Sequence, residues 1–142
     1  RAAREKGEEV AAKVTGSLIL SADTIVTIDG VILGKPADED DAVRMLRLLS
    51  GRQHSVLTAV TLINQLKPET LCGMDRTDVW FAAMSDAQIR DYIRRENVYD
   101  KAGAYPIQGF AGVYIPRISG NYFNVMGLPL PLVYDLICRT LS

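Results

Sequence analysis

Asp23 is the carboxylate whose place in the sequence best suits chemistry. It follows the apolar run 18–20 and precedes the β-branched run 24–28, and both runs are typical of buried strands. A carboxylate at the end of a core strand is held rigidly and partly desolvated, as a general base or a Mg²⁺ ligand must be. A capping or turn aspartate fits the same position, and composition alone leaves both interpretations open.

Two lysines and a glutamine are the other candidates for ligand contacts. Lys35 lies in a Gly-Lys-Pro turn directly after a predicted strand, where its ammonium group can meet a phosphate. Lys101 and Gln108 belong to the segment 100–109, whose small residues let the backbone approach a ligand closely. The glutamine amide offers a donor and an acceptor, which suits the edge of a base. A surface lysine and a tight structural loop are the alternatives.

Several familiar catalytic and metal-binding patterns are absent. His54 is the only histidine, so no Ser-His-Asp or Cys-His pair is assembled, and we expect it to have a structural role. Cys72 and Cys138 lack metal-ligand spacing, and we expect two free thiols that pack as small buried or half-buried hydrophobes. The acidic run 38–41 is expected in the first turn of a helix rather than around a metal ion. No Walker A loop occurs.

The overall composition limits the classes of function. With 142 residues, of which 48% are hydrophobic and 23% charged, the chain is expected to form a single domain over residues 1–142. Its formal net charge of −1 gives no general attraction to a nucleic acid polymer or an anionic membrane. The apolar stretches are shorter than the ~20 residues of a membrane span, and no signal peptide is recognised. We therefore expect a cytoplasmic protein.

The elements that must position these residues are both helices and strands. The dipeptide Asp29-Gly30 predicts a hairpin turn, while Asp38 and the capping box that begins at Ser85 predict helix starts. Apolar spacing predicts helices over residues 1–13, 39–50, 86–96 and 129–141, and strands over 17–21, 24–28, 31–33, 55–63, 75–84, 112–118 and 122–125. This mixture indicates the α/β class (mixed α+β) with a mixed sheet.

Taken in order, these segments resemble one family. The matching runs are SADTIV (21–26), DG (29–30), LGKP (33–36), LSGRQHSV (49–56), DKAGAYPIQG (100–109) and NVMGLPL (124–130). Over nearly the whole chain they are similar to the Maf family of nucleotide pyrophosphatases. The resemblance implies an elongated mixed α/β fold with flanking helices and a central cleft, like that of inosine-triphosphate pyrophosphatases. It also implies hydrolysis of a nucleoside triphosphate to a monophosphate and pyrophosphate, a divalent cation (Mg²⁺ or Mn²⁺) and a homodimer.

The resemblance assigns expected roles to the candidate residues. It implies that Asp23 is the proton acceptor, and the same carboxylate is a candidate metal ligand. Thr24 and Gln108 are implied in base specificity, and Lys35 and Lys101 in lining the substrate cleft. The loop Ala-Gly-Ala-Tyr-x-Ile-Gln-Gly resembles the branch that acts on dTTP and UTP rather than the branch that acts on 7-methyl-GTP, although its proline stands where glycine is more usual.

The sequence departs from the family pattern at its amino end. The family begins with a strand and a Ser-x-Ser-Pro-Arg-Arg loop that grips the phosphates, and this segment does not occur here. We therefore expect a domain shortened at its amino end, with impaired activity, because lysine does not replace the bidentate fork of arginine. Two alternatives remain: a non-catalytic nucleotide-binding or regulatory module linked to septum formation, and an interaction domain without a polar cleft.

Overall fold

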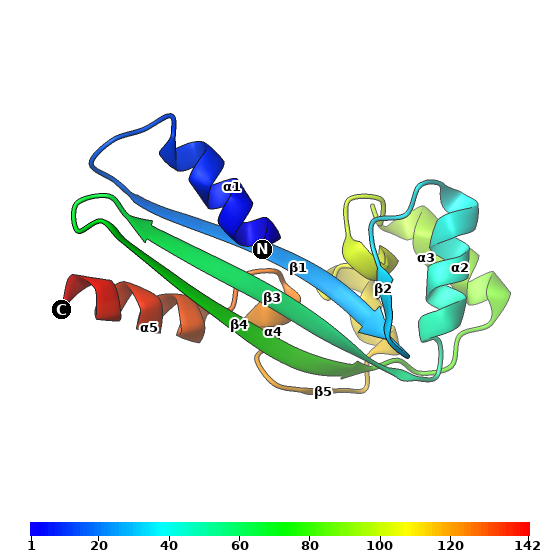
Figure 1. Cartoon of the computed structure of the whole chain (residues 1–142). Helices are drawn as coiled ribbons and strands as arrows, with labels where there is room; N and C mark the ends of the chain where they lie inside the picture. The colour runs from blue at the N-terminus through cyan, green and yellow to red at the C-terminus, as the bar shows by residue number, and fades with distance from the viewer.

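A computed structural model describes all 142 residues and contains a five-stranded sheet with helices on both faces (Figure 1). The strands are β1 (Leu18–Ile28), β2 (Val31–Leu33), β3 (Gln53–Asn64), β4 (Glu69–Trp80) and β5 (Arg117–Ser119), in the spatial order β2-β1-β3-β4-β5. The expected α/β class with flanking helices is confirmed. The pairing within the sheet is antiparallel throughout rather than mixed, because each strand runs opposite to its neighbours.

The helices surround the sheet and cap one of its ends. The elements are α1 (Ala2–Ala11), α2 (Glu39–Leu49), α3 (Asp86–Arg95), α4 (Tyr122–Val125) and α5 (Leu130–Leu141), with 3₁₀ turns η1 (Ala102–Ala104) and η2 (Gly109–Tyr114). Long strands β1, β3 and β4 extend away from the end where α2 and α3 pack together (Figure 1). None of the helices combines the length and the apolar composition that crossing a bilayer requires.

Two glycines let α1 and α5 approach opposite faces of the sheet. A Cβ on Gly7 of α1 would lie 2.9 Å from Oγ of Ser21, and a Cβ on Gly73 would lie 2.8 Å from Cδ1 of Leu132 in α5. Gly73 of β4 and Ala22 of β1 pair with the same residue of β3, so they lie on the same face of the sheet. Neighbouring residues on a strand point to opposite faces. The α1 face therefore carries Ser21, and the α5 face carries Ala22.

The main hydrophobic core lies at the end of the sheet that α2 and α3 cover. Its buried side chains include Val26, Leu46, Val79 and Ile89, and a smaller cluster lies beneath α5. The predicted helix starts are confirmed: the side chain of Asp38 accepts from the backbone N–H of the third helical residue, and Ser85 begins a complete capping box. These caps satisfy orphan backbone donors and thereby fix where α2 and α3 begin.

Three sequence-based predictions about local structure are wrong. β4 runs from Glu69 to Trp80 rather than over residues 75–84, and Gly73 within it makes room for α5. The predicted hairpin over residues 112–125 is absent: β5 pairs with β4, and Asn121 caps the short helix α4. The two cysteines are free, as expected, but both Cys72 and Cys138 are exposed because they lie on outward-facing positions of β4 and α5.

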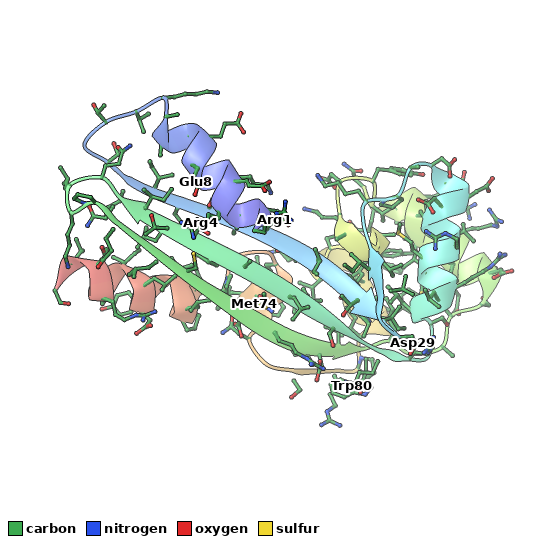
Figure 2. The ribbon with its side chains drawn as sticks, viewed as in Figure 1. Arg1, Arg4, Glu8, Asp29, Met74 and Trp80 are labelled. Atoms are coloured by element: carbon green, nitrogen blue, oxygen red, sulfur yellow. The ribbon has the colours of Figure 1, made fainter.

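The far ends of β1 and β4 carry two polar contacts that Figure 2 helps to place. Asp29 lies in the turn between β1 and β2 and forms an ion pair with Arg52. Trp80 ends β4, and the guanidinium of Arg117 lies 4.4 Å from the centroid of its ring. None of these four residues lines the cavity that forms the candidate site.

Candidate functional site

The site residues predicted from the sequence line one cavity of about 430 Å³. Asp23 and Thr24 come from β1, Lys35 from the loop after β2, and Lys101 and Gln108 from the segment around η1. The polar cleft expected from the resemblance is therefore present. The interaction-domain alternative, which required a structure without such a cleft, loses its basis.

The cavity lies along a free edge of β1. β2 pairs with β1 only from Val26 to Ile28, so residues 18–25 have β3 on one side and no strand on the other. Figure 1 shows this stretch of β1 between α1 and β2. Because Asp23 and Thr24 are consecutive in the strand, their side chains point to opposite faces of the sheet, and both reach the cavity at this edge.

Asp23 forms an ion pair with a residue that sequence reasoning missed. Nζ of Lys6, on α1, lies 2.8 Å from Oδ1 of Asp23 and donates a longer bond to the carbonyl oxygen of Ala22 at 3.5 Å. Asp23 lies inside the continuous strand β1, which excludes the capping or turn interpretation. No signal in the sequence separates Lys6 from the other charged residues of α1, such as Arg4 and Glu8, which pair with each other along the helix (Figure 2).

Positive charge outnumbers negative charge around the cavity. Three ammonium groups and two carboxylates line it: Lys6, Lys35 and Lys101, against Asp23 and Asp100. The closest approach between Lys101 and Asp100 is 4.0 Å, and Lys35 forms no ion pair. A surplus of exposed ammonium groups beside a single well-held carboxylate suits a polyanionic ligand.

A main-chain hydrogen bond joins the two loops that carry these lysines. The backbone N–H of Gly103, in η1, donates to the carbonyl oxygen of Gly34 at 3.1 Å. Gly103 has φ +74°, and a Cβ there would lie 3.1 Å from the Cγ atoms of Val26. A residue without a side chain is therefore needed for η1 to pack on β1 and hold Lys101 near Lys35.

The hydroxyl of Thr24 belongs to a buried hydrogen-bond network. Its Oγ1 lies 2.9 Å from Oγ1 of Thr58 on β3, and Thr58 in turn donates to the carbonyl oxygen of Asn124 on α4 at 3.1 Å. Gly127, with φ +106°, passes close by, since a Cβ there would lie 3.5 Å from Oγ1 of Thr24. The backbone after α4 thus forms part of the cavity wall beside this hydroxyl.

The carboxyl end of α3 holds the loop that follows Gln108. Oε1 of Glu96 accepts from the backbone N–H of Phe110 at 2.6 Å, and the guanidinium of Arg95 lies 4.8 Å from the centroid of the Phe110 ring. Gly109 has φ +78°, and a Cβ there would collide with the Glu96 carboxylate. Gln108 itself is exposed to the cavity, so its amide is free to meet a ligand.

A neutral buried pair supports the cavity wall. Nε2 of His54 lies 2.6 Å from the hydroxyl of Tyr105, which lines the cavity. Burial lowers the pKa of His54 to about 4, against the opposing attraction of the Asp78 carboxylate, and burial raises the pKa of Tyr105 above its usual range. Both side chains are neutral at pH 7. The structural role expected for His54 is confirmed by its burial and its partner.

The acidic run 38–41 has the structural role that the sequence predicts. Asp38 caps α2, and Asp41 accepts from the backbone N–H of Ala37 and pairs with Arg44. The backbone hydrogen bond and the Arg44 guanidinium hold the pKa of the Asp41 carboxyl below its usual value. No group of three His, Cys, Asp or Glu side chains in the chain is placed to hold a metal ion by itself.

Comparisons with known proteins identify the family of the chain. The family model described as "Maf-like protein" matches residues 1–140. The dTTP/UTP pyrophosphatase of Syntrophomonas wolfei is 50% identical over 139 residues, which cover 98% of this chain and 74% of that protein. The proteins of the same name from Carboxydothermus hydrogenoformans and Clostridioides difficile are 45% and 40% identical, over 92% and 100% of this chain and 70% and 73% of their own lengths. The chain belongs to the Maf family.

Proposed function

We propose that this chain is a nucleoside triphosphate pyrophosphatase acting on dTTP and UTP. The observation that carries the proposal is the shared cavity, in which one carboxylate on a rigid strand lies among three ammonium groups. The names of the relatives supply the substrate class. The products are the nucleoside monophosphate and pyrophosphate.

The two faces of β1 divide the cavity into two ends. On one face Asp23 meets Lys6, and Lys35 and Lys101 line the same cavity. On the other face Thr24 lies beside the uncharged backbone that follows α4. The proposal places the triphosphate at the charged end, and the pyrimidine at the uncharged end within reach of Thr24 and Gln108.

Asp23 is the proposed general base. Its carboxylate accepts a proton from a water molecule, whose oxygen forms a bond to the α-phosphorus in line with the leaving group. The bond from this phosphorus to the bridging oxygen breaks, and pyrophosphate leaves with the electron pair. Lys6 holds the carboxylate in position, and the ammonium groups of Lys35 and Lys101 hold the phosphates as point charges.

A divalent cation such as Mg²⁺ or Mn²⁺ fits this site as a companion of the substrate. Mg²⁺ in nucleotide sites is bound by one or two carboxylates together with phosphate oxygens and water. The cavity offers Asp23 and Asp100 as carboxylate donors and no cluster of three, which matches that pattern. Asp23 would hold the ion together with the triphosphate. When bound, the ion would neutralise negative charge on the phosphates.

Replacing the carboxylate of Asp23 tests this function. D23N keeps the shape of the side chain but removes the base, and we expect pyrophosphate release from UTP and dTTP to fall by at least about 100-fold. D40N, an exposed acid of α2 outside the cavity, is the matched control and is expected to retain full activity. Full turnover by D23N would contradict the proposal. Tight nucleotide binding without turnover in the unmodified protein would instead favour the non-catalytic module.

The remaining expectations about the molecule are proposed with the function. The two hydrophobic clusters lie on one continuous sheet, which supports treating residues 1–142 as one domain. We also propose a homodimer in the cytoplasm, as the family resemblance implies. Light scattering after size-exclusion chromatography measures the oligomeric state, and a monomer at micromolar concentration would contradict it.

A further inference from the structure

The direction of the hydrogen bonds around Thr24 is fixed by a backbone carbonyl group. The carbonyl oxygen of Asn124 can only accept, so Thr58 must donate its single hydroxyl proton in the 3.1 Å contact between them. Thr58 therefore accepts in its 2.9 Å contact with Thr24. Thr24 then donates its only hydroxyl proton to Thr58, within the protein.

The surrounding network favours this arrangement, in which the carbonyl oxygen of Asn124 accepts from Thr58 and from the backbone N–H of Gly127. Nδ2 of Asn124 donates to the carbonyl oxygen of Val56 at 3.1 Å and to Oγ1 of Thr77 at 3.0 Å, and Thr77 donates to the carbonyl oxygen of Asn121 at 2.9 Å. Thr58, Thr77 and Asn124 are 0% exposed. Each series of hydrogen bonds ends on a backbone carbonyl oxygen, so the hydroxyl and amide protons of this network all have an acceptor. These bonds hold α4 against β3 and β4.

The side chain of Thr24 is open to the cavity. The Thr24 side chain is half-buried and lines the cavity, so a ligand can reach its oxygen. A Cβ at residue 127 would lie 3.5 Å from Oγ1 of Thr24, and glycine at that position leaves this side of the oxygen uncovered. In this arrangement the hydroxyl accepts a hydrogen bond from a ligand, because its own proton is donated to Thr58.

We infer that Thr58 is a positioning residue that makes Thr24 an obligate acceptor, so that the site selects pyrimidines with a proton on N3. This inference rests on the proposed function. Uracil and thymine carry an N3–H donor, whereas N3 of cytosine is an acceptor and would place a lone pair against the lone pairs of Thr24. The Gln108 amide presents both a donor and an acceptor, so it does not make this distinction alone.

The experiment compares UTP and CTP hydrolysis by the unmodified protein, T58V and T58S. T58V removes the acceptor for the Thr24 proton and frees Thr24 to donate to cytosine N3. We expect kcat/KM for CTP to rise and the UTP-to-CTP ratio to fall by about tenfold, the effect of one mispaired hydrogen bond. T58S keeps the hydroxyl and is expected to keep the ratio. General damage to the fold would lower both values without raising that for CTP.

A second variant and a binding measurement keep the test decisive. T24V removes the acceptor itself, and we expect it to lose preference for UTP without any gain for CTP, whether or not T58V folds. Equilibrium binding of UTP and CTP reports the same preference without turnover. An unchanged UTP-to-CTP ratio in both T58V and T24V would overturn the inference. Failure of the proposed function would appear differently, as no hydrolysis of any nucleotide by the unmodified protein.

Discussion

The backbone N–H of Gly103 donates to the carbonyl oxygen of Gly34 at 3.1 Å. This bond joins the segment that carries Lys101 to the turn that carries Lys35, although the two lysines are far apart in the sequence. Main chain rather than flexible side chains therefore sets the separation of the loops that bear these two cations. Preorganised positive charge of this kind lowers the cost of ordering a polyanionic ligand.

G103A is expected to weaken both the fold and substrate binding. Residue 103 has φ +74°, and a Cβ would crowd Val26, so we expect the free energy of unfolding to fall by about 1–2 kcal/mol and KM for UTP to rise. Urea unfolding and steady-state kinetics measure the two effects. G112A is the control, because Gly112 has an ordinary φ and a Cβ on it would meet no other atom within 4 Å. Equal behaviour of the two variants would contradict this prediction.

K6M is expected to impair turnover while leaving stability almost unchanged. Lys6 holds Asp23 at 2.8 Å, but its side chain is 57% exposed, and exposed ion pairs contribute little to folding. We expect kcat/KM for UTP to fall by about tenfold, the cost of one lost charge-assisted hydrogen bond. K13M removes a comparably exposed lysine that pairs with Glu9 outside the cavity, and should behave like the unmodified protein. Matching kinetics in K6M and K13M would show that the Asp23 contact is not used.

E96A is expected to disturb the pyrimidine end of the cavity. The Glu96 carboxylate accepts from the backbone N–H of Phe110 and thereby holds the loop that presents Gln108. Without that acceptor, we expect KM for UTP to rise several-fold while kcat changes less, because Asp23 is untouched. E96Q retains an amide oxygen as acceptor and should restore most of the binding. If E96A and E96Q are equally impaired, the hydrogen bond is not the cause.

His54 is expected to make the protein less stable in mild acid. Its pKa is about 4 in the folded protein, against 6.5 as its ordinary value, so the unfolded chain binds more protons between these values. The contribution of neutral His54 to the free energy of unfolding is therefore complete above pH 6.5. It decreases by about 3 kcal/mol as the pH falls toward 4. Asp41 and Asp86, whose pKa values are lowered, lose their contributions only below their ordinary value of 3.8.

Urea unfolding at pH 7 and pH 4.5 measures this dependence. H54Q cannot take up the proton and should show a flatter change in the free energy of unfolding between the two pH values, even though its stability at pH 7 is lower. A pH dependence that is the same in H54Q and in the unmodified protein would assign the acid sensitivity to other groups.

Local patterns predicted those parts of the site that depend on local structure. Asp23 is recognisable by the strand around it, and Lys35 by its turn, because each conformation is determined within a few residues. Lys6, Thr58 and Asn124 were not predictable, since they reach the site through contacts between residues 17, 34 and 66 positions apart in the sequence. Such contacts depend on how α1 and α4 pack on the sheet, and no periodicity reports that packing.

The mistaken elements have a similar physical origin. A glycine inside a strand pattern usually signals a break, but Gly73 is used here to admit Leu132 of α5. Likewise, the aromatic and β-branched residues at 122–125 favour a strand. In the structure they form α4, which Asn121 caps. In both cases a tertiary contact outweighs the local preference.

The placement of Asp23 and Thr24 on one strand edge has a consequence for how the site can vary. A single peptide bond separates the proposed base from the proposed pyrimidine contact, so their mutual orientation is as rigid as the pleat itself. Because side chains alternate, a slip of β1 by one residue against β3 would exchange the two faces. A shift of β1 by one residue would thus not merely weaken the site: it would bring the hydroxyl to Lys6 and the carboxylate against the backbone after α4.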